Sequence, residues 1–299
     1  GRMQLVIQEL NRLDEAEIYL VDFLTVSARP VDEMVAELQT VIDMMDDPDL
    51  KRLMEHFLSD ADFMAGYTRA PAAKSMHHVC LGGLLEHSLA VAGLAGDISR
   101  RYPDLNRDLL VVGSLLHDVG LVAELRYQRS FEYTDAGKLL GHIVIGVEMV
   151  EEKIRCLGNF PQDLAVHLKH LLLSHHGQYE YGSPKRPKTM EAVILNFLDD
   201  LDSKINGVRT HIEREPDSES AWTQYHKHYD RYFFKGVGHT VLSDKADPGQ
   251  GEEKIKAPDP VSKEPSGRQG SRFSNTLGEQ LKNKDLNLLV KDIQDNSDE

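Results

Sequence analysis

Apolar residues recur every three or four positions along several stretches of the chain, which is the period of amphipathic helices. The clearest stretch is 31–45, and Asp47 followed by Pro48 then supplies a cap and a first-turn proline for a second helix through Leu58. These two stretches predict a helical hairpin. Residues 60–74 are small and irregular in pattern, and we interpret them as a loop. Further helices are expected over residues 82–101, 106–118, 137–156, 161–177 and 189–213, and an aromatic last helix over 222–235.

The two ends of the chain depart from this helical pattern. Residues 4–10 roughly alternate apolar and polar positions, so they predict one strand, and a strand needs a sheet to pair with. This strand either pairs within the chain or is the remnant of a sheet domain that precedes residue 1, and the absence of an initiating Met is compatible with such a fragment. After Gly238 the composition is typical of a disordered tail, with the pattern of a short amphipathic helix only at 277–293. The expected organisation is a strand and linker at 1–30, an all-α helical bundle at 31–238, and a tail at 239–299.

Composition narrows the function classes. The formal net charge of −15 argues against a broad basic surface for nucleic acid, so an anionic substrate would need local cations or a separate basic module. There is no apolar run of eighteen or more residues, and no membrane span is expected. The only cysteines are Cys80 and Cys156, too few for a disulfide framework or a thiolate zinc site. With no signal-peptide pattern at the start, we expect a cytoplasmic protein.

Histidines and aspartates stand at the ends or on the polar faces of successive predicted helices. The adjacent pair His117-Asp118 closes one helix, and His175-His176 closes another. Helical bundles build metal centres in this way, from inward side chains of facing helices. Periodicity does not choose between Asp199 and Asp200, since both flank an apolar stripe. The candidate ligands are His87, His117, Asp118, His142, His175, His176 and either Asp199 or Asp200.

Six or seven nitrogen and oxygen ligands exceed the needs of one tetrahedral zinc, and they fit two divalent ions that share a bridging carboxylate. Asp118 is the natural bridge, because it has two oxygens and adjoins a ligand histidine. This donor set suits Mn, Fe, Ni or Zn better than Ca or Mg. A two-metal centre activates water and hydrolyses phosphoesters without a protein nucleophile. The group that protonates the leaving oxygen is unassigned, with His78 or a water as candidates.

Several long motifs carry a resemblance to a known family. The motifs are APAAKSMHHVCLGGLLEHS (70–88), LLHDVGLVAEL (115–125), YTDAGKLLGHIVIG (133–146), LLSHHGQYEYGSPKRPKTMEAVIL (172–195) and DDLDSKI (199–205). The order H, HD, H, HH, D that they contain resembles the HD-domain superfamily of metal-dependent phosphohydrolases. More narrowly, over about residues 1–210 these motifs resemble the YhaM-type 3′-5′ exoribonucleases.

The resemblance implies a fold, a reaction and a ligand set. It implies that an OB-fold nucleic-acid-binding domain precedes the helical domain and ends in the strand at 4–10. It also implies removal of nucleotides from the 3′ end of single-stranded nucleic acid, RNA being favoured, with two divalent ions, Mn first and Fe, Ni, Zn or Mg as alternatives. By position, His87, His117, Asp118 and Asp199 match the four ligands of the superfamily, and His142, His175 and His176 match the extra positions of two-metal members. The second Asp three residues on, followed by Lys204, favours Asp199 over Asp200.

One residue departs from the family pattern. The usual HDxGK has a lysine where this chain has Leu121, and that lysine would be expected to contact a substrate phosphate. Lys74, Lys138 or Lys204 are candidates to replace it, and the loop with Lys185 and Arg186 is the best local candidate for guiding a phosphate backbone. Tyr179 and Tyr181 beside that loop are candidates for stacking bases.

Two other functions stay open at this point. One is hydrolysis of a small nucleotide or cyclic dinucleotide by an HD-type centre, although the GYP tripeptide of the HD-GYP class is replaced here by Gly182-Ser183-Pro184. The other is a metal-stabilised nucleic-acid-binding module without catalysis. The sequence is also compatible with a homo-oligomer.

Overall fold

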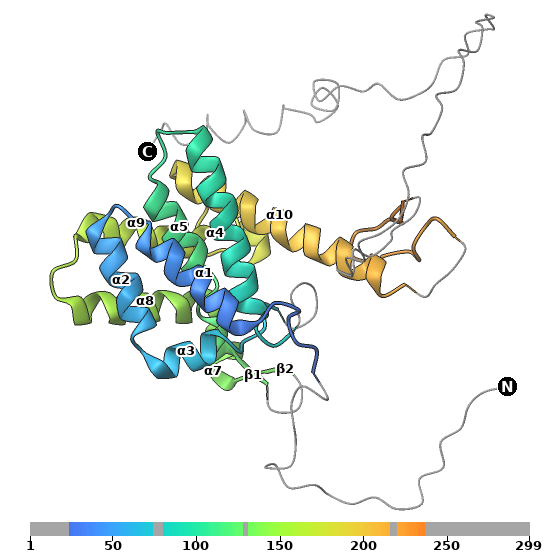
Figure 1. Ribbon diagram of the computed structural model, residues 1–299, viewed down its shortest axis with the longest axis horizontal. Helices are drawn as coiled ribbons and strands as arrows, with labels where there is room; N and C mark the ends of the chain where they lie inside the picture. Colours follow the sequence, from blue (N-terminus) through green and yellow to red (C-terminus); the bar gives the residue numbers. More distant parts are fainter. Residues whose placement is uncertain (1–23, 74–79, 128–130, 216–219, 237–299) are drawn as a thin grey trace, which may run out of the picture. The chain divides into compact units, whose positions relative to one another are not determined.

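The computed structural model describes residues 24–73, 80–127, 131–215 and 220–236. Figure 1 shows that this part of the chain is almost entirely helical, as the sequence predicts. No helix within the described ranges is long and apolar enough to cross a bilayer. The predicted strand at 4–10 and the predicted tail helix at 277–293 lie outside the described residues, and the predicted domain boundaries stay predictions.

The predicted helical hairpin is confirmed. Helix α1 is Val31–Asp43 and α2 is Pro48–Leu58. The Asp47 carboxylate accepts hydrogen bonds from the backbone N–H groups of Asp49 and Leu50, at 2.9 and 3.0 Å, which caps α2 at its proline.

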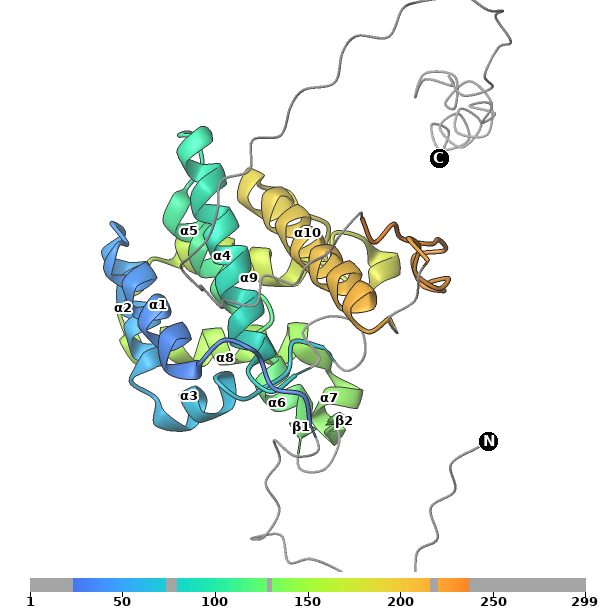
Figure 2. The ribbon, with the colours of Figure 1, turned by 45° about the vertical axis from the view of Figure 1, so that its right-hand side comes forward.

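Four helices surround the deepest part of the core. They are α4 (Gly83–Arg101), α5 (Arg107–Leu116), α9 (Gln162–Ser174) and α10 (Met190–Glu213), and Figures 1 and 2 both show α4 running beside α5. Residues 108–116 of α5 are all buried. At Gly113 a Cβ atom would lie 2.4 Å from Leu171 Cδ2, so the missing side chain lets α9 pack closely against α5. Each of these four helices supplies a residue of the site described below, or places one just beyond its end.

Residues 60–74 were predicted to be a loop, and this prediction was wrong for half of the segment. Helix α3 spans Ala61–Tyr67, and the Asp60 side chain caps it by accepting from the N–H of Phe63 at 3.0 Å. Phe63 and Tyr67 stand one turn apart, are both buried, and stack with ring centroids 5.2 Å apart. Contacts with the rest of the core therefore stabilise a helix that is too short to show a period in the sequence.

The helix predicted over 137–156 is two helices. Helix α7 is Asp135–Leu139 and α8 is Gly141–Leu157, and they are separated where Gly141 takes a φ of 77°. Before them come the one-turn helix α6 (Leu121–Glu124) and an antiparallel pair, β1 (Leu125–Tyr127) with β2 (Phe131–Tyr133), which were not predicted.

The aromatic segment 222–235 is not the helix that we predicted. Antiparallel bridges join Trp222 to Phe234 and His226 to Arg231, and Asp230 has a φ of 53° between them. Aromatic side chains favour extended pairing as readily as helix, so periodicity over fourteen residues did not distinguish the two states.

Candidate metal centre

Seven histidine and aspartate side chains from different helices converge at one end of α5. His117 caps the C-terminus of α5 and Asp118 follows it; His175 and His176 follow α9 in the same way. The other three lie within α4, α8 and α10. The side chains fall into two groups with ligand atoms mutually within 4.8 Å, namely His87, His117 and Asp199, and Asp118, His142, His175 and His176. These are the seven ligands that the sequence and the resemblance predict together.

The first group has the spacing of a metal site. His87 Nε2 lies 3.2 Å from His117 Nε2 and 3.2 Å from Asp199 Oδ1, and His117 Nε2 lies 3.7 Å from the same oxygen. Ligands bonded at about 2.1 Å to one ion stand roughly 3.0–3.4 Å apart in octahedral or tetrahedral geometry. The three atoms therefore need only small adjustments to bind one cation.

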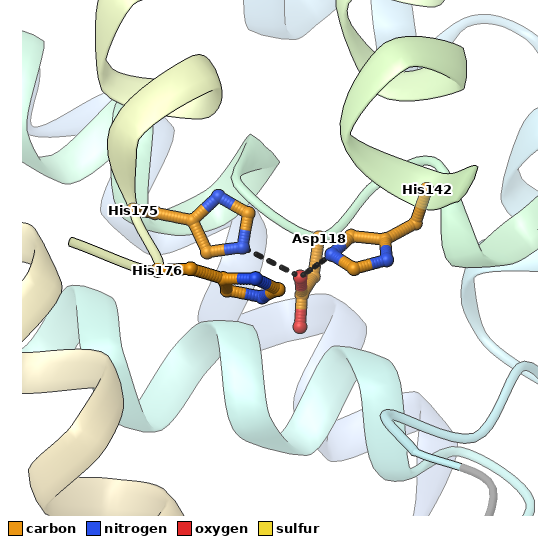
Figure 3. Close-up of side chains that lie close together, drawn as sticks. All are labelled: Asp118, His142, His175 and His176. Atoms are coloured by element: carbon orange, nitrogen blue, oxygen red, sulfur yellow. Dashed lines mark ion pairs between the residues drawn. The ribbon is translucent and has the colours of Figure 1, made fainter. Parts of the chain in front are cut away.

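Asp118 faces both groups with different oxygens. Its Oδ1 lies 3.4 Å from His142 Nε2 and 3.3 Å from His175 Nε2, the two contacts drawn in Figure 3. Its Oδ2 lies 3.5 Å from His117 Nε2 and 3.9 Å from His87 Nε2. This is the arrangement that a carboxylate bridging two ions requires.

A second layer of acceptors orients all five histidines. In each ring the Nδ1 atom faces an oxygen that can accept its proton, so Nε2 is the ring nitrogen that points into the cluster and is available to a metal. The partners are Asp202 Oδ2 for His87 (2.7 Å), Ser114 O for His117 (2.8 Å), Glu124 Oε1 for His142 (3.4 Å), Leu172 O for His175 (2.7 Å) and Tyr181 O for His176 (2.9 Å).

Two of the inward nitrogens show that the residues fit a metal. The Nε2 atoms of His142 and His175 are buried, and neither has a hydrogen-bond partner among the described residues. A buried polar atom without a partner is costly and needs an explanation. A cation bound beside Asp118 would satisfy both nitrogens at once.

The electrostatics of the cluster also favour cations. Burial raises the pKa of Asp118 and Asp199, but the surrounding histidines outweigh it and hold both pKa values well below their ordinary range. Burial likewise lowers the pKa of His87, yet its contacts with Asp199 and Asp202 raise it to about 10. Two ionised carboxylates are thus held in a buried place that attracts either protons or metal ions.

His176 differs from the other histidines. Burial and the neighbouring His175 lower its pKa to about 4. It therefore stays neutral near pH 7, which is the form that binds metals.

Two residues of the cluster's outer layer were not predicted as site residues. Glu124 accepts from the backbone N–H of His142 at 2.9 Å and also faces the ring of that histidine. Asp202 was noted only as support for choosing Asp199. Asp202 stands three residues after Asp199, so the sequence places both carboxylates on one helix face. In the structure both of them contact His87. Glu124 gave no such signal, because the fold brings it to His142 across eighteen residues.

The structure separates Asp199 from Asp200. Asp199 lies in the cluster, whereas Asp200 is exposed and pairs with Lys204 one turn along α10. Lys204, a predicted phosphate contact, is therefore drawn to the exposed side of the helix.

Known proteins similar to this chain identify its family. The family model described as HD domain matches residues 84–204. The chain is 36% identical over 243 residues to the 3′-5′ exoribonuclease YhaM of Geobacillus sp. (strain WCH70), which covers 81% of this chain and 74% of that protein. It is 38% identical over 217 residues to the 3′-5′ exoribonuclease YhaM of Bacillus subtilis (strain 168), and this match covers 72% of this chain and 68% of that protein. The chain belongs to the YhaM family.

Among solved structures, this YhaM-family chain is similar to the HD domain of the L. monocytogenes phosphodiesterase PgpH, with 22% identity, a TM-score of 0.30, and 54% and 74% of the two chains covered. The HD-domain match and the cluster together indicate that the chain binds divalent metal.

The remaining predicted substrate residues that the structure describes come from different segments. Lys74 and His78 lie outside the described residues. Lys138 is exposed on α7. Lys185 lines a pocket of about 430 Å³ against α8 and α9, together with Val147, Val166, Lys169, His170, Leu173 and Lys188. Arg186 lies over the ring of Tyr179, with its Cζ 5.2 Å from the centroid, next to the 3-10 helix η3 (Tyr179–Tyr181).

Leu121, the departure from the usual lysine, has a packing role. Its side chain is only 4% exposed and belongs to the hydrophobic core cluster. Its backbone N–H donates to the carbonyl oxygen of Asp118 at 2.9 Å, so in this member of the YhaM family residue 121 joins the turn after Asp118 to the core.

Gly120 lets the second group form. A Cβ atom there would lie 2.0 Å from the carbonyl oxygen of His142 and 2.7 Å from the N atom of Gly146. The backbone of α8 thus passes directly against the turn that follows Asp118. Only glycine permits this approach, and it brings His142 to Asp118.

We expect Gly120→Ala to destabilise the fold by at least about 2–3 kcal/mol, because the added methyl group must push α8 away. Thermal unfolding followed by circular dichroism measures the change. The matched control is Gly93→Ala within α4, where an added Cβ meets nothing within 4 Å and should leave stability equal or higher. Equal melting temperatures for the two variants would show that the close approach of α8 is not required.

Proposed function

We propose that this chain is a metal-dependent 3′-5′ exoribonuclease, which shortens single-stranded RNA from its 3′ end at the cluster around Asp118. The observation that carries the proposal is the orientation of Asp118, with one oxygen toward each group of ligands. The relatives named 3′-5′ exoribonuclease YhaM supply the reaction and its direction.

The proposed cofactor is a pair of divalent ions. His87, His117 and Asp199 would hold one, and His142, His175 and His176 the other, with Asp118 shared. Bound there, the ions supply Lewis acidity toward the phosphate and lower the pKa of water, as in other two-metal hydrolases. A donor set of imidazole and carboxylate without thiolate fits Mn²⁺, with Fe, Ni, Zn or Mg as alternatives to be measured.

The protein's own part in the reaction is to bind and orient. The Nδ1 contacts fix the tautomer of each histidine, so no ligand must reorganise when a cation arrives. Lys138, Lys185 and Arg186 remain proposed contacts for the RNA backbone. Lys74 and His78 stay predictions for phosphate contact and for protonation of the leaving oxygen. Given an RNA substrate and two free cysteines, a cytoplasmic location is part of the proposal.

The test is a time course with Mn²⁺ on a 5′-labelled RNA of about twenty nucleotides, longer than a typical single-strand binding site. We expect a ladder of progressively shorter labelled products. A matching RNA with a blocked 3′ end should resist shortening. If elemental analysis found two metals per chain but the RNA stayed intact, the proposal would fail, and a small nucleotide or cyclic dinucleotide would become the better substrate.

A further inference from the structure

The segment that follows α10 forms a two-stranded ribbon of aromatic residues. Residues 221–235 pair in antiparallel fashion, with Thr223 N donating to Phe233 O at 2.9 Å and Lys235 N donating to Ala221 O at 2.8 Å. In Figures 1 and 2 this segment is orange and follows the C-terminal end of α10. We call it the aromatic ribbon.

One face of the aromatic ribbon packs against the end of α10. The side chain of Tyr229 packs directly against Gly207 of α10, where an added Cβ atom would lie only 2.6 Å from the Tyr229 hydroxyl oxygen. His211 Nε2 lies 3.1 Å from the carbonyl oxygen of Gln224, and the rings of His211 and His226 are 4.6 Å apart. These contacts fix the ribbon to the helix, so the aromatic residues of its other face are not needed for anchoring.

Four other aromatic side chains of the ribbon are exposed to solvent, and we call the surface they form its outer face. Trp222 is 54% exposed, Phe234 51%, Tyr225 44% and Tyr232 58%. They form two ring pairs across the ribbon, Trp222 with Phe234 at 5.2 Å and Tyr225 with Tyr232 at 5.3 Å between centroids. Single exposed aromatics are common, but four within thirteen residues form a patch that marks an interaction site.

The charge of the aromatic ribbon favours an anionic partner. Lys227, Arg231 and Lys235 accompany one carboxylate within the ribbon, Asp230, whose side chain is bonded to the Tyr225 hydroxyl. A second carboxylate, Glu215, contacts the ribbon by accepting from the N–H of Gln224 at 2.8 Å, which leaves one more cation than anions. The chain as a whole has a net charge of −15, so this local excess of cations is unusual for the molecule. Exposed aromatic rings among cations are the combination that binds single-stranded nucleic acid, by stacking bases and attracting the backbone.

Helix α10 links the ribbon to the metal centre. Asp199 lies in the cluster, and His211, twelve residues later on the same helix, contacts the ribbon. Twelve residues of α-helix span about 18 Å. An RNA strand whose 3′ end lies at the cluster can therefore reach the ribbon with nucleotides a short way upstream.

We propose that the outer face of the aromatic ribbon binds single-stranded RNA upstream of the 3′ end, by stacking bases on Trp222 and its neighbours. This inference rests on the proposed exoribonuclease function, and it adds a site that selects polymers over single nucleotides.

The chain provides its own probe, because Trp222 is its only tryptophan. The experiment uses Asp118→Asn protein, which leaves the RNA uncut, and titrates it with a labelled RNA of about twenty nucleotides. This RNA is slightly longer than the largest sites known for single-strand-binding domains, so it can reach beyond the metal centre. Label anisotropy and tryptophan fluorescence are recorded together. We expect Trp222 fluorescence to be quenched in step with RNA binding. Binding without any change in Trp222 fluorescence would overturn the proposal, and so would a fluorescence change that depends on protein concentration alone, which would indicate a second copy of the chain on the ribbon.

Kinetics supply the second measurement. The Trp222→Ala/Phe234→Ala variant should raise KM for the long RNA by about tenfold or more, the order expected when a stacked base is lost, while kcat and cleavage of a dinucleotide stay unchanged. Tyr102→Ala is the matched control, since Tyr102 is 54% exposed on another part of the surface and should change neither constant.

The two proposals fail in different ways. If wild type shortens RNA but the ribbon variant keeps the wild-type KM, the ribbon proposal is wrong and the exoribonuclease function stands. If the ribbon variant also loses dinucleotide cleavage, a second variant that keeps the rings, Trp222→Phe/Phe234→Tyr, is measured. A wild-type KM for the long RNA in this second variant supports stacking, and a raised KM contradicts it. If wild type does not shorten RNA, the proposed function fails and the ribbon proposal fails with it.

Discussion

Asp118→Asn is expected to reduce the rate of RNA shortening by at least about a thousandfold. One metal position loses its ligand oxygen and both lose the shared negative charge, and a thousandfold loss corresponds to about 4 kcal/mol at 1.36 kcal/mol per factor of ten. Asparagine keeps the shape of the side chain but replaces one coordinating oxygen with an amide nitrogen that donates. Asp118 is the residue that contacts both groups of ligands, so its loss should affect both. The measurement is the initial rate on labelled RNA, with metal content per chain determined by elemental analysis.

The same substitution next to the cluster provides the control. Asp200→Asn makes an identical chemical change on the exposed side of α10, and we expect activity and metal content to stay unchanged. Asp199→Asn should lose metal at the first group and retain it at the second, since the cluster histidines that Asp199 contacts are His87 and His117, both of the first group. If Asp118→Asn kept both metals and its activity, Asp118 would not be the bridge.

The ligands at helix ends could be predicted because they depend on local sequence. His117-Asp118 and His175-His176 each follow an apolar helical run, and the runs themselves fix where the side chains emerge. The choice between Asp199 and Asp200 needed more. Both flank the apolar stripe of α10, and only the position of His87 on α4 determines which aspartate faces a ligand. The resemblance to a family supplied the answer that periodicity did not.

What could not be predicted depends on contacts between distant segments. Glu124 reaches His142 only because α6 and α8 meet, and they meet because Gly120 has no side chain. The same limit applies to α3, which is stabilised by the burial of Phe63 and Tyr67, and to the aromatic ribbon, which is fixed by His211 on α10. Leu121 looked like a missing phosphate contact in the sequence, and its burial gives it a different role.

Removing the metals should destabilise the protein, because the cluster would keep its two buried carboxylates and its inward nitrogens without a cation. A ligand present at a hundred times its dissociation constant stabilises a fold by about 2.7 kcal/mol. For a domain of this size that corresponds to a melting temperature lower by roughly 5–10 °C after chelation. Thermal unfolding with and without a chelator measures it. Asp118→Asn protein should respond much less, and an equal response in both proteins would place the stabilising metal elsewhere.

The loss of melting temperature on chelation should also become larger as pH rises, and the reason lies in the pKa of His87. In the metal-free protein its pKa is raised to about 10, so a proton there offsets the negative charge of Asp199 and Asp202. A group whose folded pKa exceeds its unfolded value of about 6.5 contributes stability that is full below pH 6.5 and is lost as pH rises toward 10. Metal binding needs the deprotonated ring and is favoured over the same range. The melting temperatures with and without chelator should therefore differ more at pH 9 than at pH 7. At the higher pH the metal-free protein begins to lose the His87 proton, which at pH 7 offsets part of the negative charge that the metal would neutralise. A difference that shrank with rising pH would show that protonated His87 does not stabilise the metal-free site.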